Sequence, residues 1–352
     1  MFDQHFDDLA LSEWQRRRQT FLDPRSGLTT SATQLLAQAL RSAAQAKSEW
    51  DELAGGLMDL RPNEDLHQIE QFYRLVLKVG GKGREMVEEE LLRYFLLTAA
   101  DASIPFLLEL CQVERAHDRY TKTRQRNAVK VLGAIAVAQR SLLADQALLG
   151  LLRHPQATVR QAAITYGGGR FRLSDEPTPD RWITGLRLLL REEASSPVRA
   201  AAAYLLWNLG QSLPFDARLA YACRVRFQGM PIPSRTILTP ARATLADLQR
   251  AIQHAMGWDN DHLYAFFMDG GGWHSDCPFW APGCEDGPFA DQVQLGQLAL
   301  EPGQHFLYLF DFGDGHRFDV DVLGMQVMEP GGIYPRVIER VGESFAQYGI
   351  SE

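Results

Sequence analysis

Two aspartates and a histidine crowd one short stretch of this 352-residue chain, and a second histidine lies upstream. Asp311, Asp314 and His316 fall within HFLYLFDFGDGHRFDVDVL (305–323), and His262 precedes them. Carboxylates and imidazoles bind divalent metal ions and act as general acids and bases. Carboxylates three residues apart can converge across a turn, but Asp and Gly are also what a tight turn requires. Both interpretations stay open, and the ordinary capped turn is favoured.

A His-x2-Cys-x6-Cys spacing offers another set of ligands in His274, Cys277 and Cys284. Structural zinc usually has four ligands in characteristic pairs, so here one ligand would come from a distant part of the chain. We favour a loop rich in Gly, Trp and Pro that holds two unrelated thiols.

Asp319 and Asp321 alternate with apolar residues on the segment after the turn. Exposed Asp on an edge strand often serves only to deter aggregation. We therefore expect both carboxylates to be solvated.

Other catalytic patterns do not occur in the sequence. There is no Gly-x-Ser-x-Gly elbow, and none of the four cysteines has a known catalytic context. Gly80–Gly83 lacks the preceding strand and the Lys-Ser/Thr of a phosphate-binding P-loop, so it fits the end of a helix better. Enzymatic activity is therefore uncertain, a protein without one is favoured, and no cofactor is expected.

The turn at Gly313-Asp314-Gly315 joins two predicted strands, 305–312 and 317–323, as a hairpin. Upstream, the patterns predict strands at 221–227, 234–238 and 263–268, a helix that begins at Thr244 and stops at Gly257, and a loop over 269–290. This order indicates an α+β domain with the helix on one face of a mixed sheet, similar to a β-grasp core.

The residues before 213 read as helices, at 4–22, 31–59 and about 64–79. Three further apolar helices, 103–112, 142–152 and 182–190, start at intervals of roughly forty residues. Each precedes a second helix with an Arg and small residues, as in PQATVRQAA (155–163) and SSPVRAAAA (195–203). A helix pair recurring at this interval indicates an α-solenoid, and the units resemble HEAT repeats. Gly167–Arg170 is expected to interrupt the middle unit as a loop.

Charge is divided unevenly along the chain. Residues 1–113 hold 12 Lys and Arg against 18 Asp and Glu, residues 114–200 hold 15 against 8, and residues 201–352 hold 9 against 18. The basic middle suggests either a polyanionic partner or domains that attract one another, and the second is favoured. The candidate basic surface comprises Arg124, Arg126, Lys130, Arg160 and Arg199. For Arg126, Arg160 and Arg199, interhelical hydrogen bonds are favoured over phosphate binding.

The C-terminal block resembles the plasmid pRiA4b ORF-3-like family. Four pieces carry the likeness: TLADLQRAIQHAMGWDNDHLYAF (244–266), VQLGQLAL (293–300), FLYLFDFGDGHRFDVDVL (306–323) and YPRVIERVGE (334–343). The resemblance implies an α+β domain of poorly defined function, found on bacterial plasmids and as a passenger in insertion sequences. It places fixed motif positions at Trp258, Asp259, His262, Asp311, Gly313 and Asp314.

This sequence departs from the family pattern in two places. The family's aromatic residue and histidine just after the turn are replaced by His316 and Phe318. Its Pro-Pro-Glu-Asp segment does not follow Tyr334-Pro335. If those groups form a site in the family, this chain has lost or rearranged it.

Together the patterns predict a helical region (1–100), HEAT-like repeats (101–212) and a pRiA4b ORF-3-like α+β domain (213–352). We expect a non-enzymatic bacterial interaction protein, associated with mobile elements in the manner of the family. The alternatives are a nucleic-acid-associated factor that uses the basic surface and a metal-dependent enzyme with a site at 311–316. The tentative binding residues are Asp311, Asp314, His316, His262 and Trp258. A protein partner is expected first and nucleic acid second.

The sequence contains no run of eighteen apolar residues, so no membrane association is expected. Its sparse cysteines suit a reducing cytoplasm.

Overall fold

The structure, a computed structural model, describes residues 66–79, 87–88, 91–92, 95, 100–112, 121–173 and 177–347. The helices predicted at 4–22 and 31–59 and the glycines at 80–83 lie outside these residues. The chain divides into two compact units, Met1–Gly150 and Leu151–Glu352, and each is described by itself. None of the helices in the described ranges combines the length and the apolar character of a membrane span.

The first unit is helical where it is described. Its elements are α4 (Leu66–Val79), a 3₁₀ turn (Ala100–Ser103), α6 (Ile104–Gln112), α7 (Thr121–Ala138) and most of α8 (Leu142–Leu151). The rings of Tyr73, Phe95 and Phe106 pack with centroids 5.2–6.3 Å apart in its core. α4, α6 and α8 agree with the helices predicted there, because their apolar residues recur at helical spacing and are buried together.

The second unit begins with further helices. They are α9 (Ala157–Ala162), a π-helical turn (Ala163–Gly168), a 3₁₀ turn (Gly169–Leu173), α10 (Asp180–Glu192) and α11 (Ser196–Asn208). The loop predicted at 167–170 is therefore wrong, since the chain stays helical through these glycines. A Cβ at Gly168 would clash with Leu205 of α11 and lie 3.3 Å from the Trp182 ring of α10. Glycine therefore allows both helices to pack closely against the π-helical turn.

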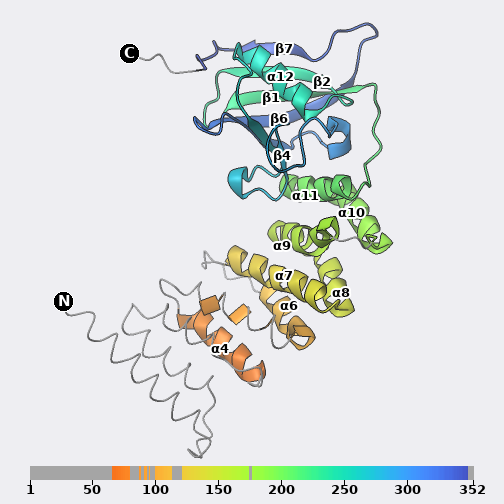
Figure 1. The fold of residues 1–352 in the computed structure, drawn as a ribbon, viewed down its shortest axis with the longest axis vertical. Helices are drawn as coiled ribbons and strands as arrows, with labels where there is room; N and C mark the ends of the chain where they lie inside the picture. The colour runs from red at the N-terminus through yellow and green to blue at the C-terminus, as the bar shows by residue number, and fades with distance from the viewer. Residues whose placement is uncertain are drawn as a thin grey trace, which may run out of the picture. The chain divides into compact units, whose positions relative to one another are not determined.

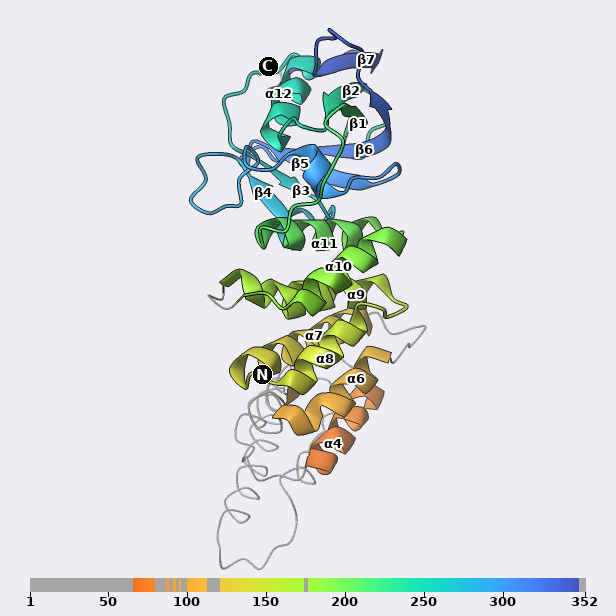
Figure 2. The same cartoon turned by 90° about the vertical axis from the view of Figure 1, so that its right-hand side faces the viewer.

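A seven-stranded sheet in the order β4-β3-β5-β6-β1-β2-β7 completes this unit (Figures 1 and 2). Every strand pair is antiparallel, so the mixed sheet expected from the β-grasp analogy is wrong. The strands are β1 (Leu219–Phe227), β2 (Ser234–Pro240), β3 (Tyr264–Phe267), β4 (Pro278–Trp280), β5 (His305–Phe310), β6 (His316–Val327) and β7 (Arg336–Val341). β4 falls inside the predicted loop 269–290, because its three residues pair with β3.

One helix, α12 (Leu245–Met256), lies on one face of the sheet. Its start is as predicted: Thr244 accepts a hydrogen bond from the Asp247 amide, and the Asp247 carboxylate accepts one from the Thr244 amide. Gly257 ends it with φ 73°, a left-handed conformation that glycine adopts readily. Gln253 on this helix donates to the Tyr308 hydroxyl on β5 at 2.8 Å, which identifies the face that α12 covers.

The strand register divides the sheet residues between two faces. On the face covered by α12, here called the helix face, Val225 pairs with Val320 and Phe306 with Val320, and all are buried. On the opposite face, the network face, Arg224 lies opposite Asp321, which lies opposite His305. Side chains alternate along β6, so its apolar residues face the core and its charged residues face the other side of the sheet.

The helix that precedes the first strand, α11, packs directly against the sheet within the second unit. The Phe279 ring of β4 lies 5.2–5.3 Å from the rings of Tyr204 and Trp207. Ser196 at the start of α11 bonds with both the backbone amide and the carbonyl of His305. The helix-to-strand change between Asn208 and Leu219 is thus bridged by packing and hydrogen bonds.

Candidate functional site

The turn between β5 and β6 is held by Asp311. This residue has φ 56°, and its Oδ1 accepts hydrogen bonds from the amides of Gly313 (2.9 Å) and Asp314 (3.4 Å). Its own carbonyl accepts one from the Gly315 amide at 2.7 Å. A buried Asp in the left-handed region whose side chain caps the following amides is a common turn device. Asp311 is therefore the capping residue, and the Asp314 carboxylate has no part in holding the turn through these bonds.

Five side chains meet at this turn and are called the turn site: Trp258, His262, Asp311, Asp314 and His316. Asp311, Asp314 and His316 each offer one ligand atom, and these atoms all lie within 4.8 Å of one another. His262 Nε2 lies 3.6 Å from Asp311 Oδ2, and His316 Nε2 lies 3.8 Å from Asp314 Oδ2. The turn site thus brings together all the tentative binding residues of the C-terminal block.

His316 has a restricted environment. Its ring centroid lies 4.9 Å from that of Trp258, edge to face, and 6.2 Å from that of Phe227. Its Nε2 atom is buried and makes no hydrogen bond within the described residues. A buried polar nitrogen without a partner costs free energy unless something binds it. His316 Nε2 is therefore available as a ligand atom on the Asp314 side of the turn.

The C-terminal segment fixes the loop that carries Trp258 and His262. Trp258 Nε1 donates to the Phe345 carbonyl at 2.8 Å. Gln347 accepts from the Asp259 amide at 2.5 Å and donates to Asp261 Oδ1 at 3.0 Å. These hydrogen bonds join residues 258–261 to residues 345–347, which are 86–88 positions later in the sequence. The position of the loop therefore depends on the C-terminal segment as well as on α12.

The sulfur-containing candidates are arranged differently. Cys277 is buried at the start of β4, Cys284 is half-buried and His274 is exposed. Among the described residues, the group of three potential ligands found close together is the one at the turn, and it includes none of His274, Cys277 and Cys284. The interpretation of unrelated thiols in a loop remains the simpler one.

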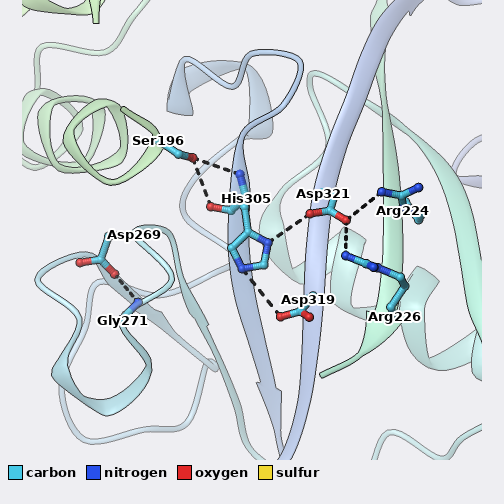
Figure 3. Close-up of polar contacts among 8 residues, drawn as sticks. All are labelled: Ser196, Arg224, Arg226, Asp269, Gly271, His305, Asp319 and Asp321. Carbon is cyan, nitrogen blue, oxygen red and sulfur yellow. Dashed lines mark hydrogen bonds and ion pairs between the residues drawn. The ribbon is translucent and has the colours of Figure 1, made fainter. Parts of the chain in front are cut away.

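A second polar cluster lies on the network face and is shown in Figure 3. This sheet-face network consists of Arg224, Arg226, His305, Asp319 and Asp321. Arg224 and Arg226 donate to the same oxygen, Asp321 Oδ2, at 3.2 and 2.7 Å. His305 lies between the two carboxylates, with Nδ1 3.2 Å from Asp321 Oδ1 and Nε2 3.7 Å from Asp319 Oδ1.

The expectation that Asp319 and Asp321 are solvated on an edge strand is wrong. β6 lies between β5 and β1, and each carboxylate side chain is only 20% exposed. Burial alone would raise the pKa of Asp321. Hydrogen bonds from His305 and Arg224 and the charge of Arg226 outweigh this effect, so the pKa of Asp321 lies below its ordinary value. Asp321 therefore remains a carboxylate at neutral pH and orients its three neighbours.

Sequence reasoning missed Arg224, Arg226 and His305 as members of one cluster. The available signal was the alternation of Arg224 and Arg226 along one face of a predicted strand. Their partners are nearly a hundred residues away and are fixed only by the β1–β6 register. A single sequence contains no direct indication of that register.

Most of the arginines that were candidates for a basic surface on the helices have hydrogen-bond partners inside the protein. Arg124 is buried and pairs with Glu88 at 2.9 and 3.2 Å. Arg160 pairs with Glu193 at 2.6 and 2.7 Å and also donates to the carbonyls of two preceding residues. The surface interpretation is wrong for Arg124, because a side chain that is 1% exposed cannot meet a partner in solution.

Arg199 is also buried, so the surface interpretation is wrong for it too. It donates to the carbonyls of Leu190 (2.6 Å), Glu193 (3.3 Å) and Ala299 (2.8 Å). These bonds join α11 to α10 and to the turn at Ala299, upstream of β5. Arg126 is half-buried, and Lys130 is the member of this set that lies fully at the surface.

Comparison with known proteins identifies relatives of the C-terminal region. Residues 220–345 match the family model "Plasmid pRiA4b ORF-3-like protein". The uncharacterized protein y4hQ of Sinorhizobium fredii (strain NBRC 101917 / NGR234) is 36% identical over 94 residues, which are 26% of this chain and 46% of that protein. The chain thus spans under half the length of that relative.

Among solved structures, a protein of unknown function from Methanosarcina mazei Go1, MM3350, aligns with a TM-score of 0.30 and 24% identity. The alignment covers 35% of this chain and 68% of that one. The family model that matches residues 220–345 is the one that the motifs of this region resemble, and the names of these relatives give no activity.

Proposed function

We propose that the turn site binds a divalent transition-metal ion. The observation that carries the proposal is the convergence of Asp311, Asp314 and His316, whose ligand atoms lie within 4.8 Å of one another. Ligands of Zn²⁺ lie at about 2.0–2.2 Å from the ion, so the donors of a tetrahedral site are about 3.3–3.6 Å apart, and a small movement of the exposed Asp314 would complete the set. The site lies at the turn that joins β5 to β6.

The donor chemistry favours transition metals over Mg²⁺ or Ca²⁺. Two carboxylates and one imidazole form a mixed oxygen and nitrogen set: the imidazole favours Zn²⁺ and related transition metals, and the carboxylates also suit Mn²⁺. His262, 40% exposed and 3.6 Å from Asp311 Oδ2, is placed to add a fourth donor. The turn amides that bond Asp311 Oδ1 would orient this ligand from outside the coordination shell.

The departure from the family pattern is consistent with a rearranged site. Positions 316 and 318 point to the same face of β6, since successive side chains of a strand alternate. Moving the imidazole from 318 to 316 therefore keeps it on the helix face and brings it to the turn. Phe318 instead packs at 5.4 Å from the Trp258 ring.

Metal titration of the full chain, prepared without chelators, tests the proposal. Zn²⁺ or Mn²⁺ is expected to raise the melting temperature by several degrees, because an ion that binds only the folded state stabilises it by about 2.7 kcal/mol at one hundred times its Kd. Mg²⁺ is expected to do less. Melting temperatures that do not respond to any of these ions would rule the site out.

Three variants separate ligation from turn capping. Asp311→Asn keeps an oxygen for the turn amides but removes the charge, so metal affinity should fall at least about tenfold with little change in folding. Asp314→Ala changes a side chain that is 59% exposed, so we expect weaker metal binding and a stability change within about 0.5 kcal/mol. Asp286→Asn, an exposed carboxylate outside the turn site, is the control. Equal metal affinity in all three proteins would contradict the proposal.

We also propose that the helices before the sheet are HEAT-like repeats that bind a protein partner. Support comes from three exposed apolar side chains, Val137, Leu142 and Leu143, where α7 meets α8. Solenoids commonly bind partners on such surfaces. Leu142→Ser with Leu143→Ser should abolish recovery of the partner in pull-down from the host, and unchanged recovery would contradict the proposed binding surface.

Nucleic-acid binding by these helices has less support, since Arg124, Arg160 and Arg199 already have internal partners.

A further inference from the structure

The sheet-face network has more hydrogen-bond donors than its shared carboxylate can satisfy. Arg224 and Arg226 reach one oxygen of Asp321, and His305 lies against the other. Two guanidinium groups that meet at one oxygen repel each other, and the second carboxylate of the network, Asp319, lies against His305 Nε2 at 3.7 Å. Each guanidinium carries five N–H donors, and the bonds to Asp321 use one nitrogen of each.

The positive groups also form the outer layer of this face. The side chains of Arg224, Arg226 and His305 are 41, 30 and 41% exposed, whereas those of Asp319 and Asp321 are 20% exposed. Arg317, which the register places on the same face opposite Leu309, is exposed as well. A ligand approaching from solvent therefore meets N–H donors first and carboxylates beneath them.

Neighbouring elements hold the network in place. Gly270 lies beside the imidazole, since a Cβ there would be 3.5 Å from His305 Cδ2. Asp269 fixes this loop by accepting hydrogen bonds from the amides of Gly271 and Asp276, as Figure 3 shows for Gly271. Ser196 anchors the backbone of His305 from the other side. The donors thus lie on β1 and β5, and the loop and the helix end hold His305 in place, which lowers the cost of binding a ligand.

We propose that the sheet-face network binds a small phosphate-bearing ligand, with its oxygens on the solvent side of Arg224 and Arg226 and beside His305. Guanidinium groups favour phosphate because their planar donors match two oxygens at once. Charge argues for a small ligand over a polymer: residues 201–352 hold 9 Lys and Arg against 18 Asp and Glu, and this balance repels an extended polyanion. Asp319 and one oxygen of Asp321 face the imidazole, and the other oxygen of Asp321 lies between the two guanidinium groups.

This site is separate from the turn site. His316 lies on the helix face of β6, whereas Asp319 and Asp321 lie on the network face, so no side chain is shared. Phosphate binding here requires no metal ion, and metal binding at the turn requires none of the network residues.

Calorimetric titration of the full chain with inorganic phosphate, in chelator-treated buffer, tests the inference. We expect saturable binding that falls at least tenfold in the double variant Arg224→Gln/Arg226→Gln. Arg336→Gln, which removes an exposed guanidinium paired with Glu329, is the matched control and should bind within twofold of the wild type. If the double variant does not fold, Arg226→Lys keeps the charge and removes the fork, and it should still weaken binding severalfold.

Three outcomes would overturn the proposal. Wild-type protein that shows no saturable binding of phosphate lacks the site. Binding that the arginine variants retain places the phosphate elsewhere. Binding that appears only when Zn²⁺ is added belongs to the turn site. In a further arm, single-stranded DNA that binds tightly, displaces phosphate and loses affinity in the double variant would replace the small ligand with a polymer.

Discussion

Arginine serves opposite purposes in the helices and on the sheet. In the helices, Arg124 and Arg199 are buried and satisfied by a carboxylate or by backbone carbonyls. On the sheet, Arg224 and Arg226 share one carboxylate oxygen and remain 41 and 30% exposed. The region with the higher content of basic residues thus turns several of them inward, and the acidic region presents a small cluster outward. Charge counted along a sequence does not locate a charged surface.

The strongest test of this contrast is Arg124→Ala. Glu88 is 5% exposed and would lose its guanidinium partner, so we expect the free energy of unfolding to fall by about 3–5 kcal/mol. Thermal and denaturant unfolding would measure the change. Lys130→Ala on the same helix removes an exposed charge and should stay within about 0.5 kcal/mol. Equal, small effects would mean that Arg124 is not a structural residue.

Arg199→Ala should have the next largest effect. Three carbonyls, of Leu190, Glu193 and Ala299, would lose a charged donor in a buried setting, at a cost of about 2–3 kcal/mol. Because the Ala299 bond joins α11 to the turn upstream of β5, hydrogen exchange should rise in both segments. Arg191→Ala, exposed at the end of α10, serves as the control. Exchange that rises in α11 alone would show that the Ala299 bond contributes nothing.

Asp321→Asn should have the smallest effect and the clearest pH dependence. At neutral pH the loss of a partly exposed ion-pair network is expected to cost about 1 kcal/mol or less. The folded-state pKa of Asp321 is lowered, so its contribution is present above the unfolded pKa of about 3.9 and is lost as pH falls through the folded pKa. Unfolding curves of the variant and the wild type should therefore differ at pH 7 and converge below about pH 4. A gap that persists at low pH would show that charge is not the cause.

Local signals predicted the elements well. Thr244 and Asp247 form the capping pair that their spacing indicates, and Gly257 ends the helix in the left-handed conformation. The β5–β6 hairpin follows from alternating apolar residues around a turn with Gly and Asp, and the register Phe310–His316 closes it. These features depend on neighbouring residues only, so one sequence contains the information they need.

Predictions that required a distant partner failed. The strand carrying Asp319 and Asp321 was assigned to an edge, but β1 pairs with it from about a hundred residues earlier. The capped turn did not need a distant partner, since Asp311 takes φ 56° and its carboxylate accepts hydrogen bonds from the amides two and three residues later. The mixed sheet was wrong since strand direction depends on how all seven strands assemble.

The sequence by itself determined most of the helical and strand segments, the caps of α12, the hairpin and the family likeness of the C-terminal region. These follow from residue spacing and from backbone preferences that act over a few residues. The tertiary structure alone decided which charges are buried, which carboxylate holds Arg224 and Arg226, and that His262 reaches the turn from another loop. The physical reason is that burial and ion pairing depend on side chains brought together by strand register and packing, over separations that local spacing does not encode.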